Sequence, residues 1–135
     1  MTFLRLALGV VIFPHGIQKT LGWFGGPGFH AMMAAFIQGG IPALFAFLAI
    51  CAEFLGGLGL IVGFLSRIAA FGILCVMLVA IFRVNLQFGL FMNWAGNQKG
   101  EGVEFHILAI GIGLAILIRG AGAFSVDRAL TGSRR

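Results

Sequence analysis

The chain has 135 residues, of which 60% are hydrophobic and 10% are charged. A soluble domain carries roughly 45–50% apolar and about 25% charged residues, and a domain this small keeps too much of its area exposed to hide the excess. This composition excludes an ordinary soluble domain and a disordered chain, and two cysteines are too few for a disulfide scaffold. The net charge of +5 does not indicate nucleic-acid binding, because the basic residues are scattered singly among apolar runs until a small C-terminal cluster.

Four apolar stretches approach the roughly 20 residues that a membrane-spanning helix needs. They cover residues 3–20, 42–64, 68–90 and 104–118, of which the last is short. Residues 29–37 of the long connection after the first stretch predict a short interfacial helix, and Ser125 predicts a cap for another helix after the fourth stretch. We therefore expect an all-α membrane protein: a four-transmembrane-helix bundle formed by residues 1–135 as a single domain, with these two short helices added.

The positions of Lys and Arg predict the orientation, because cytoplasmic loops carry an excess of both. In a four-span topology, six basic residues lie on the side of the termini and three on the opposite side. They are Arg5, Arg67, Arg119, Arg128, Arg134 and Arg135 against Lys19, Arg83 and Lys99. We expect both termini to be cytoplasmic, and we expect the first helix to be retained because no small-x-small cleavage pattern follows it.

Glycines are frequent inside the predicted spans as well as in the loops. The second stretch contains Gly56, Gly57 and the GxxxG pair Gly59 and Gly63. Small residues allow membrane helices to approach closely. The pattern predicts tight helix packing at these positions.

Polar residues gather in the outer half of the predicted bundle. His15, Gln18 and Lys19 are spaced i, i+3, i+4 near the end of the first span, so they share one helix face. Glu53 lies near the middle of the second span, where an isolated charge is costly, so it is either protonated or paired. Its available partners are Lys19, Arg83 and His15. Glu53 has two possible roles: it carries protons for a bound ligand, or it forms a structural ion pair between helices.

His106 opens the fourth span, and Arg83 lies toward the outer end of the third. Arg83 has two interpretations: it pairs with Glu53, or its side chain extends to the lipid headgroups. His15 and His106 on facing helices could ligate a haem, and with Glu53 they could bind a metal ion. Neither arrangement has a diagnostic spacing, so we expect no haem or metal centre.

The order of several motifs resembles the DoxX family of small bacterial membrane proteins. The resemblance is carried by Leu4-Arg5-Leu6, His15-Gly16-x-Gln18-Lys19, Gly22-Trp23-Phe24-Gly25-Gly26-Pro27-Gly28, Ala52-Glu53-x-x-Gly56-Gly57, Ser66-Arg67, the loop from Asn93 to His106, and the tail from Gly120 to Arg128. It covers nearly the whole chain. The family implies a four-helix protein of the bacterial inner membrane, with relatives linked to thiosulfate:quinone oxidoreductase and to oxidative, thiol and quinone stress. It carries over no defined reaction and no catalytic residue.

Two functions from different classes fit these residues. In the first, the protein is a redox-associated membrane component that binds a quinone or similar apolar molecule and receives electrons from a partner oxidoreductase. In the second, it is a non-enzymatic anchor or assembly subunit, or a carrier of small molecules or lipids. The ligand-binding candidates are His15, Gln18, Lys19, Trp23, Phe24, Glu53, Arg83 and His106. Besides the lipid bilayer, the partners left open are the oxidoreductase and a second copy of the chain.

Overall fold

The computed structural model describes residues 1–132, which contain six α-helices and no strand. The helices are α1 (Thr2–Thr20), α2 (Gly28–Gln38), α3 (Ala43–Val62), α4 (Ser66–Ala80), α5 (Glu104–Arg119) and α6 (Val126–Gly132). Arg134 and Arg135, two of the six basic residues used to predict the orientation, lie outside the described residues.

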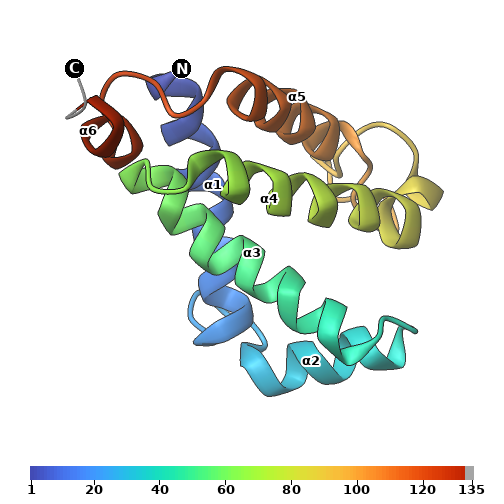
Figure 1. The fold of residues 1–135 in the computed structure, drawn as a ribbon. Coiled ribbons are helices and arrows are strands. Elements are labelled where there is room, and N and C mark those ends of the chain that lie inside the picture. The colour runs from blue at the N-terminus through green and yellow to red at the C-terminus, as the bar shows by residue number, and fades with distance from the viewer. Residues whose placement is uncertain (133–135) are drawn as a thin grey trace.

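The long helices form two pairs that diverge from a common end (Figure 1). Helix α1 packs against α3, α4 packs against α5, and α3 and α4 meet near the tight turn that connects them. The N-terminus, this turn, the end of α5 and α6 gather at the common end. We call it the closed end; α2 and the connection between α4 and α5 lie at the two open ends of the pairs.

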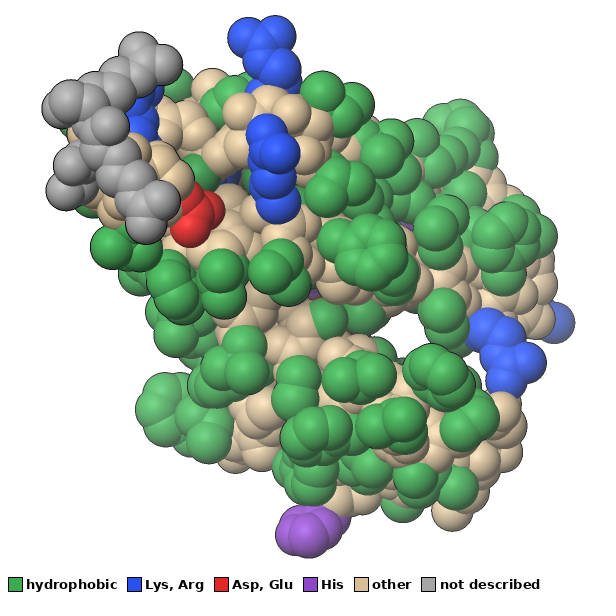
Figure 2. All heavy atoms as spheres, viewed as in Figure 1, with side chains coloured by type: hydrophobic (Ala, Val, Ile, Leu, Met, Phe, Trp, Pro, Cys, Tyr) green, Lys and Arg blue, Asp and Glu red, His purple; other side chains and the backbone are tan. Residues whose placement is uncertain are grey.

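A compact apolar core joins the four long helices. Every one of them contributes buried side chains to it, namely Leu8, Ile12, Leu60, Ala70, Ile73, Met77, Ala109 and Ile116. Outside this core, large hydrophobic side chains face outward; Phe82 and Ile118 are each 70% exposed. Figure 2 shows hydrophobic side chains spread over most of one face. Water would penalise such a surface, whereas lipid would not, so the protein has the surface of a membrane protein.

Two helical stretches are long and apolar enough to cross a membrane. They are α3, with 20 residues, and the 23-residue stretch Ser66–Phe88, which begins with α4. Helix α5 has only 16 residues, and polar residues lower the hydropathy of the 19-residue α1. The structure therefore confirms an all-helical protein with two candidate spans, and the other two spans stay a prediction.

The predicted elements agree closely with the observed helices, including the two short ones. The backbone N–H of Arg128 donates to Ser125 Oγ over 3.2 Å, as expected for a cap of α6. The third stretch differs, because α4 ends at Ala80 and continues as a π-helical turn (Ile81–Asn85) and a 3-10 turn (Leu86–Phe88). A wider π-helical turn and a tighter 3-10 turn are not visible in a hydrophobic pattern, which responds only to the average helical period.

The predicted GxxxG pair lies at the chain reversal after α3, where a Cβ on Gly59 would lie 3.8 Å from Ala69 Cβ of α4. Gly63 ends α3 with a positive φ of 76°, and a Cβ there would lie 2.4 Å from Ser125 Cβ. A Cβ on Gly59 would meet the Phe64 carbonyl of the same turn. These two glycines therefore allow the chain to reverse direction, and other glycines bring α1 and α3 together.

Arg5 is not the exposed orientation marker that the sequence predicts. It is 1% exposed at the closed end. Its guanidinium donates to the Ala121 carbonyl over 3.0 Å and to the Ile61 carbonyl over 2.8 Å, and it also reaches the carbonyls of Leu60 and Phe124. Arg5 is therefore a structural link between α1, the end of α3 and the segment that follows α5.

Candidate functional site

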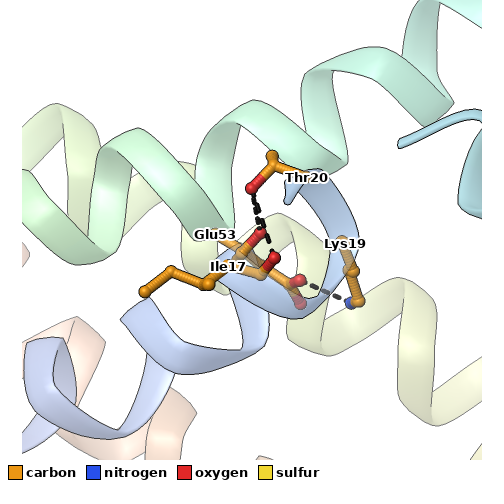
Figure 3. A network of polar contacts seen from close by, with 5 residues as sticks. Ile17, Lys19, Thr20 and Glu53 are labelled. Atoms are coloured by element: carbon orange, nitrogen blue, oxygen red, sulfur yellow. Dashed lines mark hydrogen bonds and ion pairs between the residues drawn. The ribbon is translucent and has the colours of Figure 1, made fainter. Parts of the chain in front are cut away.

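A buried ion pair joins α1 to α3. Lys19 Nζ lies 2.5 Å from Glu53 Oε2, and Figure 3 shows the two side chains meeting between the helices. The Glu53 side chain is 4% exposed and that of Lys19 is 23% exposed. Pairing of Glu53 with Lys19, one of the alternatives predicted from the sequence, is thus confirmed.

The close approach of the two helices depends on a glycine next to the pair. A Cβ on Gly16 would lie 2.5 Å from both the N and the Cα of Phe54, so no larger residue fits there without movement of the backbone. Gly16 lies one turn before Lys19 and contacts the residue after Glu53. The missing side chain therefore sets the distance at which Lys19 reaches the carboxylate.

The last turn of α1 is held by its own side-chain hydrogen bond. Thr20 Oγ1 donates to the Gly16 carbonyl over 2.8 Å and lies 3.4 Å from the Ile17 carbonyl (Figure 3). This is the back-bonding of a helical threonine to the carbonyl one turn earlier. The Ile17 carbonyl also accepts the backbone N–H groups of Leu21 and Gly22 at the end of the helix.

Two histidines lie near the ion pair. The His15 ring is 6.2 Å from the Phe105 ring, which is itself 5.5 Å from the ring of His106. Glu53, His15 and Lys19 all lie within electrostatic range of His106. Four of the predicted residues, from α1, α3 and α5, thus form one cluster.

His106 brings an unused polar atom to this cluster. Its Nδ1 is buried and has no hydrogen-bond partner among residues 1–132, although the Gly102 carbonyl lies near the ring. A buried polar atom without a partner is uncommon, because losing its hydration without replacement costs free energy. It marks a position where a ligand group or a water molecule would be stabilised.

Helix α2 covers the cluster on the side of Lys19. The Lys19 ammonium lies 5.7 Å from the centroid of the Phe36 ring, a distance that favours a cation–π interaction. The roles of Phe36 and Phe105 could not be predicted from the sequence, since aromatic residues on apolar stretches are common. The packing role of Gly16 could not be predicted either, because its only local signal is its place between His15 and Lys19.

The remaining candidates lie around the cluster and do not join it. Gln18 Nε2 donates to the Phe24 carbonyl over 3.3 Å, so Gln18 contacts the connection between α1 and α2. Trp23 and Phe24 in that connection are 60% and 70% exposed. The alternative pairing of Glu53 with Arg83 is wrong, because the Arg83 guanidinium instead donates to the Gly39 carbonyl over 3.1 Å.

An apolar groove of about 400 Å³ opens between the two helix pairs. It runs between the start of α3 and the end of α4, and its lining residues are Gly40, Ile41, Pro42, Phe45, Leu78, Val79, Phe82 and Arg83. Figure 2 shows an opening between the upper and lower halves of the molecule. The contact between Arg83 and Gly39 bridges the two halves at the groove.

The described residues offer no candidate metal centre. Residues 1–132 contain no group of three or more His, Cys, Asp or Glu side chains arranged to hold an ion.

Comparison with known families decides to which family the chain belongs. The family model DoxX matches residues 1–86. The chain belongs to the DoxX family. The matched region of this DoxX protein contains Lys19 and Glu53 and ends before His106. Searches of curated proteins and of solved structures found no match.

Proposed function

We propose that this DoxX protein binds a quinone-like molecule beside the Lys19–Glu53 pair and acts with a partner oxidoreductase. The observation that carries the proposal is the polar cluster itself. A buried acid, a partly buried base and two histidines meet among largely apolar helices, and one histidine nitrogen has no partner among the described residues. Polar groups inside a membrane are costly and are usually retained for function.

The cluster contains the groups that quinone chemistry requires. The two carbonyl oxygens of a quinone accept hydrogen bonds, which the Lys19 ammonium and an imidazole N–H can donate. Reduction to the quinol takes up two electrons and two protons, and Glu53 and the histidines are the groups that exchange protons with the reduced oxygens. The two electrons come from the partner oxidoreductase.

The groove between the helix pairs offers the ligand a route from the lipid. Its walls are mainly apolar, as the hydrocarbon tail of a membrane quinone requires. Phe45 in the groove precedes Glu53 on α3 by eight residues, about 12 Å along the helix. A quinone with its tail in the groove would bring its ring toward the polar cluster.

The same proposal includes four membrane spans in the bacterial inner membrane, with the closed end in the cytoplasm. The support is that the N-terminus, the α3–α4 turn and α6 gather at one end, as an even number of spans requires. Of the seven described basic residues, four belong to that end, namely Arg5, Arg67, Arg119 and Arg128. The other three are Lys19, Arg83 and Lys99, so the excess is one residue in the direction of the positive-inside rule.

Quenching of tryptophan fluorescence by a short-chain quinone tests the proposal. The full chain carrying Trp94→Phe is titrated in detergent, so that Trp23 is the reporting tryptophan. The His15→Ala/Glu53→Ala variant on this background is expected to weaken the apparent affinity at least tenfold. The matched control is His30→Ala/Lys99→Ala, which removes one exposed histidine and one exposed charged residue and should bind as the parent does. Equal affinity in the cluster variant, or no saturable quenching in the parent, would overturn quinone binding and favour the non-enzymatic anchor.

A further inference from the structure

A second cavity, of about 690 Å³, lies at the closed end of the molecule, on the other side of the core from the polar cluster. It is formed by the α3–α4 turn, the end of α5, the following glycine-rich segment and α6. Its charged lining residues are Arg67, Arg119, Asp127 and Arg128, and Ser66 lies among them. Figure 2 shows basic side chains at this end of the molecule, with an acidic one beside them.

The lining of this cavity is positively charged. Three arginines carry +3 and Asp127 carries −1, which leaves +2. The Asp127 carboxylate is already occupied, because it accepts the backbone N–H groups of Leu65 and Ser66 over 2.7 and 2.8 Å. Asp127 therefore serves the start of α4 and leaves the arginines without a neutralising carboxylate.

The arginine side chains retain most of their hydrogen-bond donors. Arg67 donates one hydrogen bond to the Ile118 carbonyl, over 3.2 Å. Within residues 1–132, the side chains of Arg119 and Arg128 make no hydrogen bond or ion pair. Guanidinium groups bind phosphate oxygens well, since their planar array of donors matches two oxygens at once.

Ser66 gives an independent sign of an incomplete site. It is fully buried, and its Oγ has no hydrogen-bond partner in the described part of the chain, although the residue lines the cavity. The hydroxyl can donate to an acceptor that the protein itself does not supply. An anionic oxygen brought in by a ligand would satisfy it.

The rim of the cavity is apolar. Phe64, Leu65, Ile68 and Leu130 line it together with the arginines, and the side chains of Ile68 and Leu130 are 67% and 62% exposed. A site for a free anion needs no such rim. A molecule with a charged head and a hydrocarbon chain contacts both parts, with its head among the arginines and its chain along the rim.

We propose that this cavity binds the phosphate group of an anionic phospholipid. Arg67, Arg119 and Arg128 contact the phosphate, Ser66 donates to one of its oxygens, and an acyl chain lies along Ile68 and Leu130. The site is separate from the quinone site and does not depend on it. Bound there, the lipid would connect α5, α6 and the α3–α4 turn.

Native mass spectrometry of the full chain in detergent tests this site, with phosphatidylglycerol as the probe and phosphatidylcholine as the uncharged reference. The wild type should bind phosphatidylglycerol more tightly than phosphatidylcholine. Each arginine near a membrane surface contributes about fivefold to binding an anionic lipid, so Arg119→Gln/Arg128→Gln should lose more than tenfold. Ser66→Ala should lose severalfold without a loss of thermal stability. The control Lys99→Gln removes one positive charge at an open end and should bind like the wild type, whereas Arg128→Gln alone should lose about fivefold.

The competing sources of phosphate are separated in the same experiment. If glycerol 1-phosphate displaces phosphatidylglycerol at a concentration comparable to that of the lipid, the acyl chain contributes nothing to the affinity. The ligand of the cavity would then be a soluble phosphate compound and the lipid proposal would be overturned. An equal loss in the control variant would show a response to net charge alone and would overturn the site. So would equal binding of both lipids by the wild type. Because the quinone titration probes different residues, its outcome and this one are read independently.

Discussion

Arg5 and Glu53 are both charged and both buried, yet the protein holds them in different ways. Arg5 donates to four backbone carbonyls at the closed end and is 1% exposed. Glu53 depends on Lys19, whose side chain is 23% exposed. A charge that several backbone groups satisfy cannot be released without unfolding, whereas a charge held by one long side chain can exchange its partner. The comparison separates a structural charge from one that is suited to ligand binding.

The largest effect is expected from Arg5→Met. This substitution keeps an unbranched apolar stem but leaves four carbonyls without their donor, and each buried group left unsatisfied costs about 1–3 kcal/mol. We expect the free energy of unfolding to fall by about 4 kcal/mol or more, measured by thermal unfolding in detergent. Arg119→Met, at an exposed arginine without such contacts among the described residues, should leave the unfolding temperature unchanged. A small effect of Arg5→Met would contradict its structural role.

A smaller effect is expected from breaking the Lys19–Glu53 pair. Lys19→Met leaves a carboxylate buried without its counter-charge, which should cost about 3 kcal/mol. In the double variant Lys19→Met/Glu53→Gln that charge is gone, so the loss should be less than for Lys19→Met alone. Thermal unfolding of Lys19→Met, Glu53→Gln and the double variant gives the coupling free energy between the two residues. If the two single losses simply add, the ion pair contributes nothing to stability.

The smallest effect is expected from Gly16→Ala. Its Cβ would lie 2.5 Å from the backbone of Phe54, and overpacking of this kind costs roughly 1–3 kcal/mol. It should also move Lys19 away from Glu53 and weaken quinone quenching. Gly111→Ala is the matched control, because a Cβ on that helical glycine meets nothing within 4 Å. The control should be neutral or stabilising by about 0.5–1 kcal/mol, since alanine favours the helix. Equal behaviour of both variants would contradict the close packing at Gly16.

Much of the helical framework could be predicted from the sequence because long apolar runs bounded by glycine and polar residues define helices directly. The cap at Ser125 was predictable for the same reason, since it depends on neighbours in sequence. The sequence limited the possible partners of Glu53 to Lys19, Arg83 and His15 and could not choose among them. Charge alone allowed Lys19 or Arg83, and the choice between them depends on which helices pack together.

The features that were missed depend on contacts between distant segments. Arg5 resembles any basic residue near the start of a membrane helix, and its burial follows from carbonyls that lie 55 to 119 residues away in sequence. Gly16 is one of 22 glycines, and only the packing of α3 against α1 distinguishes it. The GxxxG pair predicted helix packing, and its main role differs because the same spacing also serves a chain reversal at the end of a helix.

The contacts of Arg5 also bear on how the protein is made. Two of its acceptors, the carbonyls of Ala121 and Phe124, lie 116 and 119 residues after it. During synthesis, the first helix emerges from the ribosome long before these carbonyls exist. Its charged side chain therefore stays in water or among lipid headgroups until the segment after α5 has been made. The N-terminal end of α1 thus reaches its final position only after a segment more than 100 residues later in the chain has been synthesised.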